Sequence, residues 1–351
     1  MSRPVSRSLK SVKTPHSIEA FLPNAQPSIQ PFIQRSRFRK KLLAWYGLHR
    51  RDLPWRANRD PYRVWLSEIM LQQTRVAAVI EHYREFLRRF PTVEKLAAAR
   101  EASVLAAWSG LGYYRRARMM HAAAKIIVRA HGGNLPQSEA GLRGLPGIGR
   151  YTAAAIASIA YEEPVAVVDG NVERVLQRVL GKRLAGEGLW VAANELLDTN
   201  CPGDFNQAVM ELGAVICTPR APQCLTCPVV EMCATRGELA GTVKAPAQEK
   251  REIHYALHCR NGDDEVFLVQ RALDAPLMAG MWELPELPSP YGAEIPAFSL
   301  RHSITITDYT VRVVRAATPA EAPGKWISVG KLHKLALTGL ARKILRKAVI
   351  L

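Results

Sequence analysis

A change of hydrophobic periodicity near residue 240 constrains the fold of this chain more than any other feature. Before it, apolar residues recur with helical spacing, as Val76, Val79 and Tyr83 do at i, i+3 and i+7. After it, apolar and polar residues alternate with the two-residue period of a β-strand. The two patterns predict a multidomain protein, with an all-α domain over residues 37–240 and a smaller α+β domain over residues 253–351.

The remaining segments have the composition of a tail and a linker. Residues 1–36 are rich in Ser, Pro and Arg, carry the single acid Glu19, and are expected to form a disordered basic tail. Residues 241–252 are expected to form a polar linker. Within the second domain, Asn261-Gly262 predicts a hairpin turn, and Lys331 to Ile350 predicts a closing helix.

The charge of the chain indicates a polyanionic partner. Its 351 residues include 48 Lys and Arg against 31 Asp and Glu, which gives a formal net charge of +17. Nucleic acid is the first candidate, and a merely basic surface or a ribosome- or membrane-associated protein is the alternative. No apolar run reaches the roughly 18–20 residues of a membrane span, and no signal-peptide pattern opens the chain. We therefore expect no membrane association and a reducing, cytoplasmic location.

Four of the six cysteines lie together at the end of the helical region. Cys217, Cys224, Cys227 and Cys233 are separated by six, two and five residues. Thiolates this close in sequence bind zinc or an iron–sulfur cluster. Zinc sites usually combine two CxxC pairs, and here one pair is present. A disulfide framework is the competing interpretation, although a long chain with few cysteines is not typical of a disulfide scaffold.

Residues Leu142–Ala153 have the pattern of a helix–hairpin–helix. Pro146 ends the first helix, and Gly147 and Gly149 permit a turn that a Cβ atom would crowd. Backbone N–H groups at the start of the next helix can then face a phosphate, which positions DNA without reading its sequence. A simple Gly-Pro turn between two packed helices is the alternative.

Asp169 follows an apolar run and precedes a helical segment, so by itself it predicts a helix N-cap. It also lies about 20 residues after the hairpin. This order of hairpin and aspartate resembles the helix-hairpin-helix DNA glycosylases, in which the aspartate is catalytic. The cysteine spacing is similar to the loop that carries a [4Fe–4S] cluster in the same proteins. The resemblance therefore implies a [4Fe–4S] cofactor held by Cys217, Cys224, Cys227 and Cys233 over residues 217–233.

Glu68 is an acid in an otherwise apolar helical stretch. Burial raises a carboxyl pKa and suits a proton donor near neutral pH, whereas an exposed helical glutamate is the commoner situation. This stretch, together with Leu53–Arg56, resembles the MutY family of adenine DNA glycosylases. The resemblance implies that Glu68 protonates adenine N7 and that Gln72 and Gln73 enter the duplex at the lesion.

Two further positions bear on the type of glycosylase. Bifunctional relatives such as endonuclease III carry a Schiff-base lysine where this chain has Tyr151, and a tyrosine cannot form that imine. The resemblance implies that Tyr151 lies beside the deoxyribose and supports Asp169. It also implies that Asn171 lies near the reacting base. A monofunctional enzyme is expected.

Other residues are candidates for contacts with DNA. Tyr113 and Tyr114, flanked by Gly and Arg, are either packed in the core or suited to wedging into a duplex. The match to the MutY family implies that Tyr113 is such a wedge. Arg220, in the loop between the first two clustered cysteines, is expected to face phosphate.

The region 253–351 resembles the MutT-like domain with which the MutY family recognises 8-oxoguanine. Gly280–Pro285 carries the resemblance most clearly, and the Nudix box that would bind Mg²⁺ is absent. The family's Phe-Ser-His loop aligns with Ile304-Thr305-Ile306, so Thr305 offers a hydroxyl group but the imidazole is missing.

These observations together predict a monomeric, monofunctional adenine DNA glycosylase. Its expected substrate is double-stranded DNA with adenine opposite 8-oxoguanine or guanine, in the cytoplasm and associated with the nucleoid if the source is bacterial. A bifunctional glycosylase/lyase with another amine nucleophile is one alternative. A non-catalytic DNA-binding module is the other.

Overall fold

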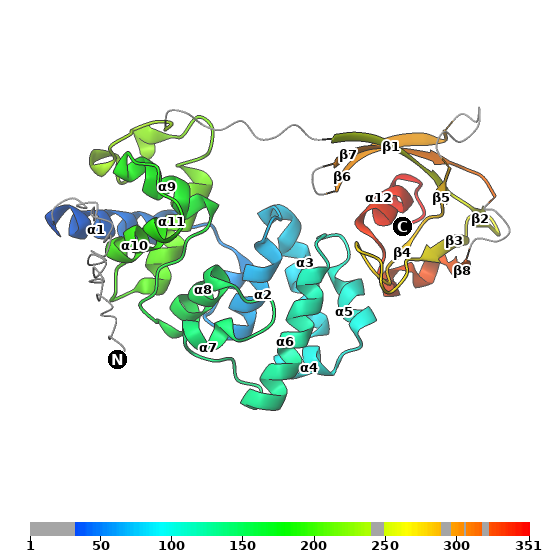
Figure 1. Cartoon of the computed structure of the whole chain (residues 1–351), viewed down its shortest axis with the longest axis horizontal. Helices are drawn as coiled ribbons and strands as arrows, with labels where there is room; N and C mark the ends of the chain where they lie inside the picture. The colour runs from blue at the N-terminus through cyan, green and yellow to red at the C-terminus, as the bar shows by residue number, and fades with distance from the viewer. Residues whose placement is uncertain (1–31, 240–248, 289–295, 305–306, 318–322) are drawn as a thin grey trace, which may run out of the picture.

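A computed structural model describes residues 32–239, 249–288, 296–304, 307–317 and 323–351. Figure 1 shows a helical part followed by a smaller part that combines strands with the helix α12 (Gly339–Lys347), so the predicted order of an all-α and an α+β domain is confirmed. The helices of the first part are α1 (Phe32–His49), α2 (Pro61–Leu71), α3 (Val76–Arg89), α4 (Val93–Ala98), α5 (Glu101–Trp108), α6 (Arg115–His131), α7 (Glu139–Arg143), α8 (Arg150–Tyr161), α9 (Gly170–Leu180), α10 (Glu187–Leu196) and α11 (Pro202–Val215).

Helix α8 lies at the centre of the helical domain and packs against α2, α7 and α11. Its alanines, Ala153 to Ala157, are at most 1% exposed, which confirms the close helix packing that their small side chains predict. Gly203 at the start of α11 continues this approach, because a Cβ atom there would lie 2.6 Å from the Ser158 carbonyl oxygen. Since only small residues allow such contact, this sequence brings α2, α8 and α11 together.

Helix ends fall where the local chemistry predicts them. Helix α6 ends at Gly132, whose φ of 58° is the left-handed conformation that glycine adopts readily. Helix α1, in contrast, begins at Phe32, so the prediction of a disordered tail as far as residue 36 is wrong for its last residues. The reason is tertiary: Arg35 pairs with Glu195 of α10 at 3.2 Å, a contact that no local pattern encodes.

The second domain contains two four-stranded sheets. One has the order β5-β1-β7-β6, with β1 and β7 parallel; the other joins β2, β3, β4 and β8 around β3. The strands are β1 (Glu249–Ala256), β2 (Cys259–Arg260), β3 (Glu265–Gln270), β4 (Trp282–Glu283), β5 (Glu286–Leu287), β6 (Phe298–Ile304), β7 (Thr307–Val314) and β8 (Gly324–Ser328).

Three local expectations for this domain have different outcomes. The hairpin at Asn261-Gly262 is confirmed, because β2 and β3 pair antiparallel across it. The linker was expected to reach residue 252, but β1 already begins at Glu249, since residues 249–252 pair in register with the start of β7. The closing helix α12 covers only Gly339–Lys347, because Leu337 bridges to Trp282 and Thr338 then caps the helix.

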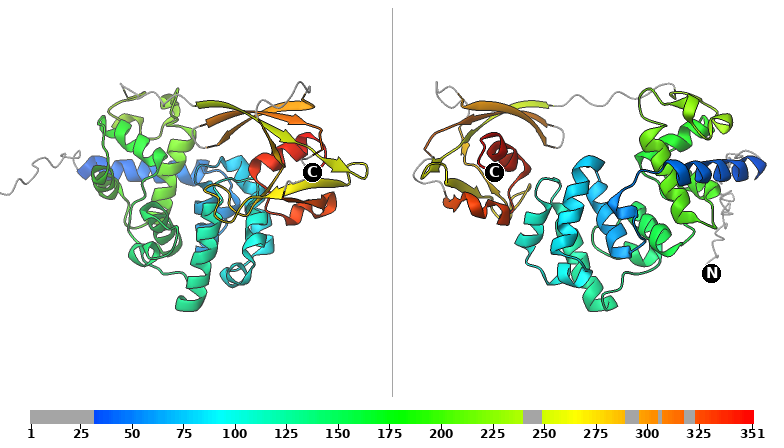
Figure 2. Two further views of the ribbon diagram at one scale, coloured as in Figure 1. Left: turned by 45° about the vertical axis from the view of Figure 1, so that its right-hand side comes forward. Right: turned by 180° about the vertical axis from the view of Figure 1, so that it is seen from behind.

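The two domains share apolar contacts. Met281 and Ala336 belong to the second domain, yet they pack in the core of the helical domain and are 0% and 6% exposed. Both views in Figure 2 place the second domain beside α3, α5 and α6. No helix among the described residues is long and apolar enough to cross a membrane.

Candidate active site

Glu68 lies on α2, whose start is fixed by Pro61 and by Asp60, the residue that caps the Arg63 N–H at 2.8 Å. The Glu68 side chain is buried, with 7% of its surface exposed, so the exposed alternative is wrong. Burial raises its pKa to about 7, the nearby negative charge of Asp169 adds to this, and a hydrogen bond from Tyr151 and the charge of Arg56 oppose it. A carboxyl group with this pKa can hold and release a proton near neutral pH.

Arg56 is held in place by a buried acid, Glu211 of α11. The Glu211 carboxylate is 1% exposed and accepts hydrogen bonds from Arg51 and Arg56 at 2.7 and 2.8 Å. Burial acts to raise its pKa, but the two arginines outweigh this and lower the pKa to about 2. Glu211 therefore stays ionised and fixes a positive charge near Glu68.

Tyr151, the second residue of α8, contacts Glu68 directly. Its hydroxyl group donates a hydrogen bond of 2.6 Å to Glu68 Oε2 and lies 3.4 Å from Met210 Sδ. Burial and the charges of Glu68 and Asp169 raise the pKa of Tyr151 well above 10, so it remains a donor. The resemblance implied support of Asp169 by Tyr151; in the structure the hydroxyl group bonds Glu68 instead.

Asp169 is the N-cap of α9, as its local pattern predicts. One carboxylate oxygen, Oδ1, accepts from the backbone N–H groups of Asn171 and Val172 at 2.9 and 2.7 Å. The other, Oδ2, accepts from Asn171 Nδ2 at 3.0 Å. Capping and an interaction with Glu68 are therefore compatible, because the cap orients a carboxylate whose charge acts on Glu68.

Arg174 connects this pair to the cysteine-containing loop, a role that the sequence did not reveal. Its Nη2 atom donates to Asn171 Oδ1 at 2.8 Å and its Nε atom donates to the Cys217 carbonyl oxygen at 2.7 Å. Gly213 allows the approach, since a Cβ atom there would lie 2.7 Å from Asn171 Cβ. The catalytic candidates and the first clustered cysteine are thus joined by consecutive hydrogen bonds.

The four clustered cysteines line one small pocket between α9, α11 and the loop that follows α11. N–H groups point at two of their sulfurs: Arg178 Nη1 lies 3.4 Å from Cys217 Sγ, and the Arg236 N–H lies 3.4 Å from Cys233 Sγ. Such donors suit thiolates bound to an iron–sulfur cluster. In the described part of the chain, no three His, Cys, Asp or Glu side chains converge closely enough to hold one metal ion, and no cysteine forms a disulfide.

The helix–hairpin–helix has the expected form, with α7 and α8 on either side of the turn. Two features require a glycine at position 147: the φ of Gly147 is 78°, and a Cβ atom there would lie 2.6 Å from Met119 Cβ. Gly149 has an ordinary φ of −84° and no atom within 4 Å of a Cβ position, so crowding inside the protein does not explain it. Gly149 is exposed, and the first N–H groups of α8 have no side-chain cap.

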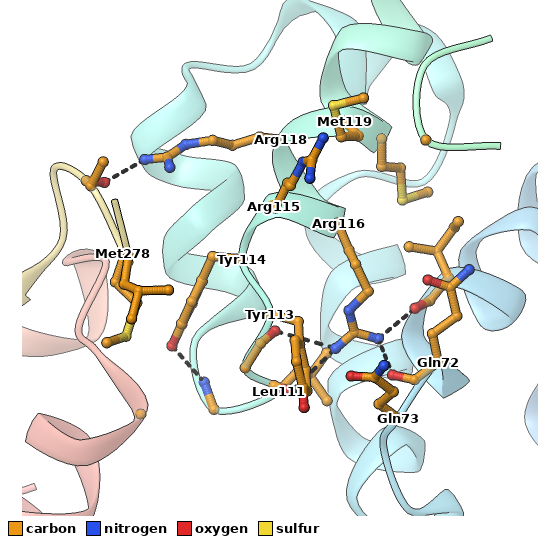
Figure 3. A pocket seen from close by; sticks show the side chains of 18 of the residues that line it. Gln72, Gln73, Leu111, Tyr113, Tyr114, Arg115, Arg116, Arg118, Met119 and Met278 are labelled. Atoms are coloured by element: carbon orange, nitrogen blue, oxygen red, sulfur yellow. Dashed lines mark hydrogen bonds between the residues drawn. The ribbon is translucent and has the colours of Figure 1, made fainter. Parts of the chain in front are cut away.

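A cavity of about 1130 Å³ lies between the two domains. Figure 3 shows its edge near α6, with Tyr113, Arg115 and Gln73 around the opening. Its cationic lining residues are Arg115, Arg116 and Arg118 of α6 and Arg342, Lys343 and Arg346 of α12, and no acid among the described residues lines it. A space this large and this positive suits a polyanion better than a small molecule.

The catalytic candidates Glu68, Tyr151, Asp169 and Asn171 are not among the residues that line this cavity. Trp65, Ile69 and Gln72 line it. Glu68 shares their face of α2, because residues three or four apart lie above one another on a helix. The carboxyl group is covered, and Tyr151 is its direct contact.

Arg116 organises the wall of the cavity. Its guanidinium group donates to the carbonyl oxygens of Ile69 and Gln72, both at 2.6 Å, and to that of Gly112 at 3.2 Å. These bonds satisfy carbonyl groups left unpaired at the end of α2. Burial lowers the pKa of Arg116 to about 10, which leaves it positively charged at neutral pH. Figure 3 shows its position between Tyr113 and the two glutamines.

The two tyrosines of the pair have different environments. Tyr114 is a core residue, 3% exposed, whereas Tyr113 is 51% exposed and lines the cavity. Tyr113 and Gln73 have positive φ values of 48° and 54°, which only a fixed local structure maintains in such residues. Gln73 is exposed, while Gln72 donates to Thr152 Oγ1 at 3.1 Å.

The remaining candidates are less fully placed. Arg220 is exposed beside the cysteine pocket. Thr305 lies outside the described residues, but β6 and β7 pair antiparallel up to Ile304 opposite Thr307. His302, which sequence reasoning missed, lines the cavity two residues before the aligned loop.

Comparisons with known proteins agree with this geometry. The model of the HhH-GPD superfamily of base excision DNA repair proteins matches residues 66–184. The mouse adenine DNA glycosylase is 34% identical over 398 residues, covering 88% of this chain and 77% of that protein.

Solved structures show the fold of the helical domain. A thermostable thymine-DNA glycosylase is 30% identical with a TM-score of 0.55, covering 58% of this chain and 97% of that chain. Endonuclease III in a trapped covalent intermediate with DNA has a TM-score of 0.51 at 21% identity, over 59% of this chain and 98% of that chain. The resemblance inferred from the sequence is confirmed, and this chain belongs to the adenine DNA glycosylase family, within the HhH-GPD superfamily.

Proposed function

We propose that this protein is a monofunctional glycosylase that removes adenine paired with 8-oxoguanine or guanine. The observation that carries the proposal is the buried Glu68 carboxyl group, with a pKa of about 7, beside Asp169 and Tyr151. One acid that can protonate a leaving group and one carboxylate that can stabilise a cation are what hydrolysis of a glycosidic bond requires.

The adenine must leave the base stack before it can reach Glu68. Tyr113 and Gln73, both exposed at the cavity, would fill the space that the base vacates. The protonated Glu68 then donates its proton to adenine N7, which makes the base a better leaving group. Tyr151 holds this carboxyl group through its 2.6 Å hydrogen bond to Oε2.

Breaking the C1′–N9 bond leaves positive charge on the deoxyribose. Asp169 is oriented to stabilise this cation, because three N–H groups fix its two oxygens. Once Glu68 has lost its proton it can activate a water molecule, which completes an abasic site. With Tyr151 at the position of the lysine in bifunctional relatives, no imine forms there.

Double-stranded DNA is proposed to occupy the cationic cavity between the domains. The open space at Gly149 and the uncapped start of α8 suit close approach of a phosphate to backbone N–H groups. Arg220 adds an exposed positive charge beside the cysteine pocket. Residues 253–351 are proposed as the domain that reads the base opposite adenine, with Thr305 offering a hydroxyl group.

The cysteine pocket fits a [4Fe–4S] cluster. A single zinc ion requires its thiolates to converge on one point, whereas a cluster binds each thiolate to a different iron. Cys217, Cys224, Cys227 and Cys233 line one pocket, and we propose that each would bind one iron of the cluster. The cluster would hold the loop of residues 217–233 rigid, and the proposed reaction needs no electron transfer.

The protein is further proposed to act as a monomer in the compartment that holds its DNA substrate, the cytoplasm and the nucleoid if the source is bacterial. A single chain supplies both carboxylates and both walls of the cavity.

Single-turnover adenine release tests the proposal, with duplexes that carry adenine opposite 8-oxoguanine, guanine, cytosine or thymine. We expect fast release opposite 8-oxoguanine and slow release opposite thymine. Glu68→Gln should lower the rate by several powers of ten, because the proton acts mainly in the transition state. Near-normal excision by that variant would contradict the acid role.

The same duplexes separate the alternatives. Trapping of a covalent DNA adduct with borohydride would indicate a lyase with another amine nucleophile. Equal rates opposite 8-oxoguanine and guanine would remove the proposed discrimination. Absence of adenine release would leave a DNA-binding module.

A further inference from the structure

Ser109, directly after α5, is the buried meeting point of the two domains. It is 2% exposed. Its hydroxyl group donates to the Leu337 carbonyl oxygen at 2.7 Å and accepts from Arg342 Nε at 3.1 Å. Both partners belong to the second domain. One small side chain of the helical domain therefore makes two hydrogen bonds across the boundary.

Tyr114 reaches the same carbonyl oxygen from the other end of the loop. Its hydroxyl group donates to Leu337 O at 3.0 Å and accepts from the Gly110 N–H at 3.4 Å. A carbonyl oxygen has two lone pairs, and here Ser109 and Tyr114 use both of them. The loop of residues 109–114 is thus fixed at both ends to one peptide group of the second domain.

The loop has little freedom between these two ends. The Ser109 carbonyl oxygen lies 3.1 Å from His82 Nε2 of α3. Gly110 has a φ of 109°, and a Cβ atom there would lie 2.9 Å from the same imidazole nitrogen and 3.8 Å from Arg342 Cδ. The loop is therefore clamped between α3 and α12, and Tyr113 is its exposed residue that lines the cavity.

The Leu337 peptide group is also linked to strand β6 through helix α12. Thr338 follows Leu337 and caps α12 by accepting from the Ala341 N–H at 3.1 Å. One turn further along α12, Lys343 Nζ donates to the Arg301 carbonyl oxygen at 2.6 Å. His302, the next residue of β6, lines the cavity two residues before the aligned recognition loop.

We propose that Ser109, Tyr114 and Arg342 form an interdomain latch that positions Tyr113 according to how the second domain is docked. The three are positioning residues. They hold the loop of residues 109–114, which carries Tyr113, against Leu337 and, through α12, against β6. The latch makes wedge insertion depend on the base that the second domain meets. The inference rests on the proposed function, because it assigns opposite-base reading to that domain.

Apolar packing by Met281 and Ala336 already holds the two domains together. The latch therefore contributes something other than domain association. Apolar contacts are not directional, whereas two hydrogen bonds to one carbonyl oxygen fix the register of the loop. Loss of a latch bond should therefore change selectivity for the opposite base more than it changes folding.

The test is a single-turnover comparison of the full-length wild-type protein with Tyr114→Phe and Ser109→Ala. The readout is the ratio of adenine release opposite 8-oxoguanine to release opposite cytosine. Each latch variant should lower this ratio about three- to tenfold, the order expected for one buried hydrogen bond.

Tyr62→Phe is the matched control. The Tyr62 hydroxyl group is buried and donates to the Phe90 carbonyl oxygen at 2.8 Å, within the helical domain and outside the latch. It loses the same kind of bond and should lower the melting temperature without changing the ratio. An equal change of the ratio in Tyr62→Phe and Tyr114→Phe would overturn the latch, and so would an unchanged ratio in both latch variants.

A second readout does not depend on 8-oxoguanine. The adenine analogue 2-aminopurine, placed opposite guanine, becomes fluorescent when the protein unstacks it. The latch predicts slower unstacking in Tyr114→Phe and Ser109→Ala than in the wild type and Tyr62→Phe, and equal unstacking in all four would overturn it. If the wild type itself does not distinguish opposite bases, the second domain does not read the opposite base and that part of the proposed function is wrong. In that case the unstacking rates alone test the latch.

Discussion

Burial of the Glu68 carboxyl group has two consequences: the group keeps a proton that the proposed reaction uses, and its ionisation costs folding free energy. Glu68→Gln should remove both, and the loss of each can be measured in a different assay. The folded-state pKa of Glu68 is about 7, against 4.5 for an ordinary glutamate. Below about pH 4.5 the folded and unfolded states are both protonated, and the acid costs nothing. As the pH rises toward 7 the unfolded chain releases its proton more readily, so stability falls and the loss is complete above about 7.

The size of this effect follows from the pKa difference between 4.5 and about 7. At about 1.4 kcal/mol per pKa unit, the full cost is about 3 kcal/mol. Most of it, about 2 to 3 kcal/mol, develops between about pH 5 and pH 8. A glutamine has no charge to ionise, so the variant should lack this part of the pH dependence. For a domain of this size, the difference amounts to about 5–10 °C in melting temperature.

Thermal unfolding at pH 5 and pH 8 measures the difference directly. Between these pH values the wild type should lose more stability than Glu68→Gln does, although we expect that variant to be almost inactive in adenine excision. Glu81→Gln is the control, because Glu81 is a helical glutamate with 81% of its side chain exposed. Parallel pH profiles of the wild type and Glu68→Gln would refute the assignment of a raised pKa. In the wild type, single-turnover excision should also fall about tenfold per pH unit above about pH 7.

Four other changes have outcomes that the structure specifies. Arg174→Met removes the hydrogen bonds to the Cys217 carbonyl oxygen and to Asn171 Oδ1, so excision should fall about 10- to 100-fold because Asn171 and Asp169 are less well oriented. Single-turnover rates and iron content, measured together, show whether the loop of residues 217–233 is affected as well. Gly147→Ala should lower stability by about 1–3 kcal/mol in chemical denaturation, because its φ is positive and the space is filled. Gly149→Ala should leave stability nearly unchanged and weaken DNA binding in a titration, since its Cβ position is open. Glu211→Gln should cost about 2–3 kcal/mol, because the partly buried Arg51 and Arg56 lose their charged hydrogen-bond acceptor. With its pKa lowered to about 2, the contribution of Glu211 is present above about pH 4.5 and is lost as the pH falls toward 2, which acid titrations of the two proteins compare.

The sequence was sufficient for features that depend on local chemistry. The helical period, the left-handed glycine at the end of α6 and the aspartate cap of α9 all follow from neighbouring residues. These elements are specified by contacts within one or two turns of chain, where spacing and residue type carry the information. The burial of Glu68 did not follow in the same way, because its position in an apolar stretch left the exposed alternative open and only the packing of α2 decides it.

The errors and omissions have a different origin. The start of α1 and the start of β1 were missed because each is fixed by a distant partner, Glu195 in one case and β7 in the other. The partner of Tyr151 was missed for the same reason, since its hydrogen bond spans 83 residues of sequence. The sequence placed Arg116 only as an arginine that flanks the tyrosine pair, although its guanidinium group binds carbonyl oxygens from two separate segments.

Two buried glutamates in the same part of the helical domain have pKa values shifted in opposite directions. Glu211 is buried but ionised, because two arginines and their hydrogen bonds more than offset the loss of water. Glu68 is also buried, and burial raises its pKa because no arginine among the described residues contacts it directly. The hydrogen bond from the Tyr151 hydroxyl group opposes this rise only in part, and the charge of Asp169 adds to it. Removing the positive charge of Arg56 would raise the pKa of Glu68 further and slow the release of its proton. Arg56, fixed by Glu211, therefore helps to keep the pKa of Glu68 close to neutral, where in the proposed reaction one carboxyl group serves as acid and then as base.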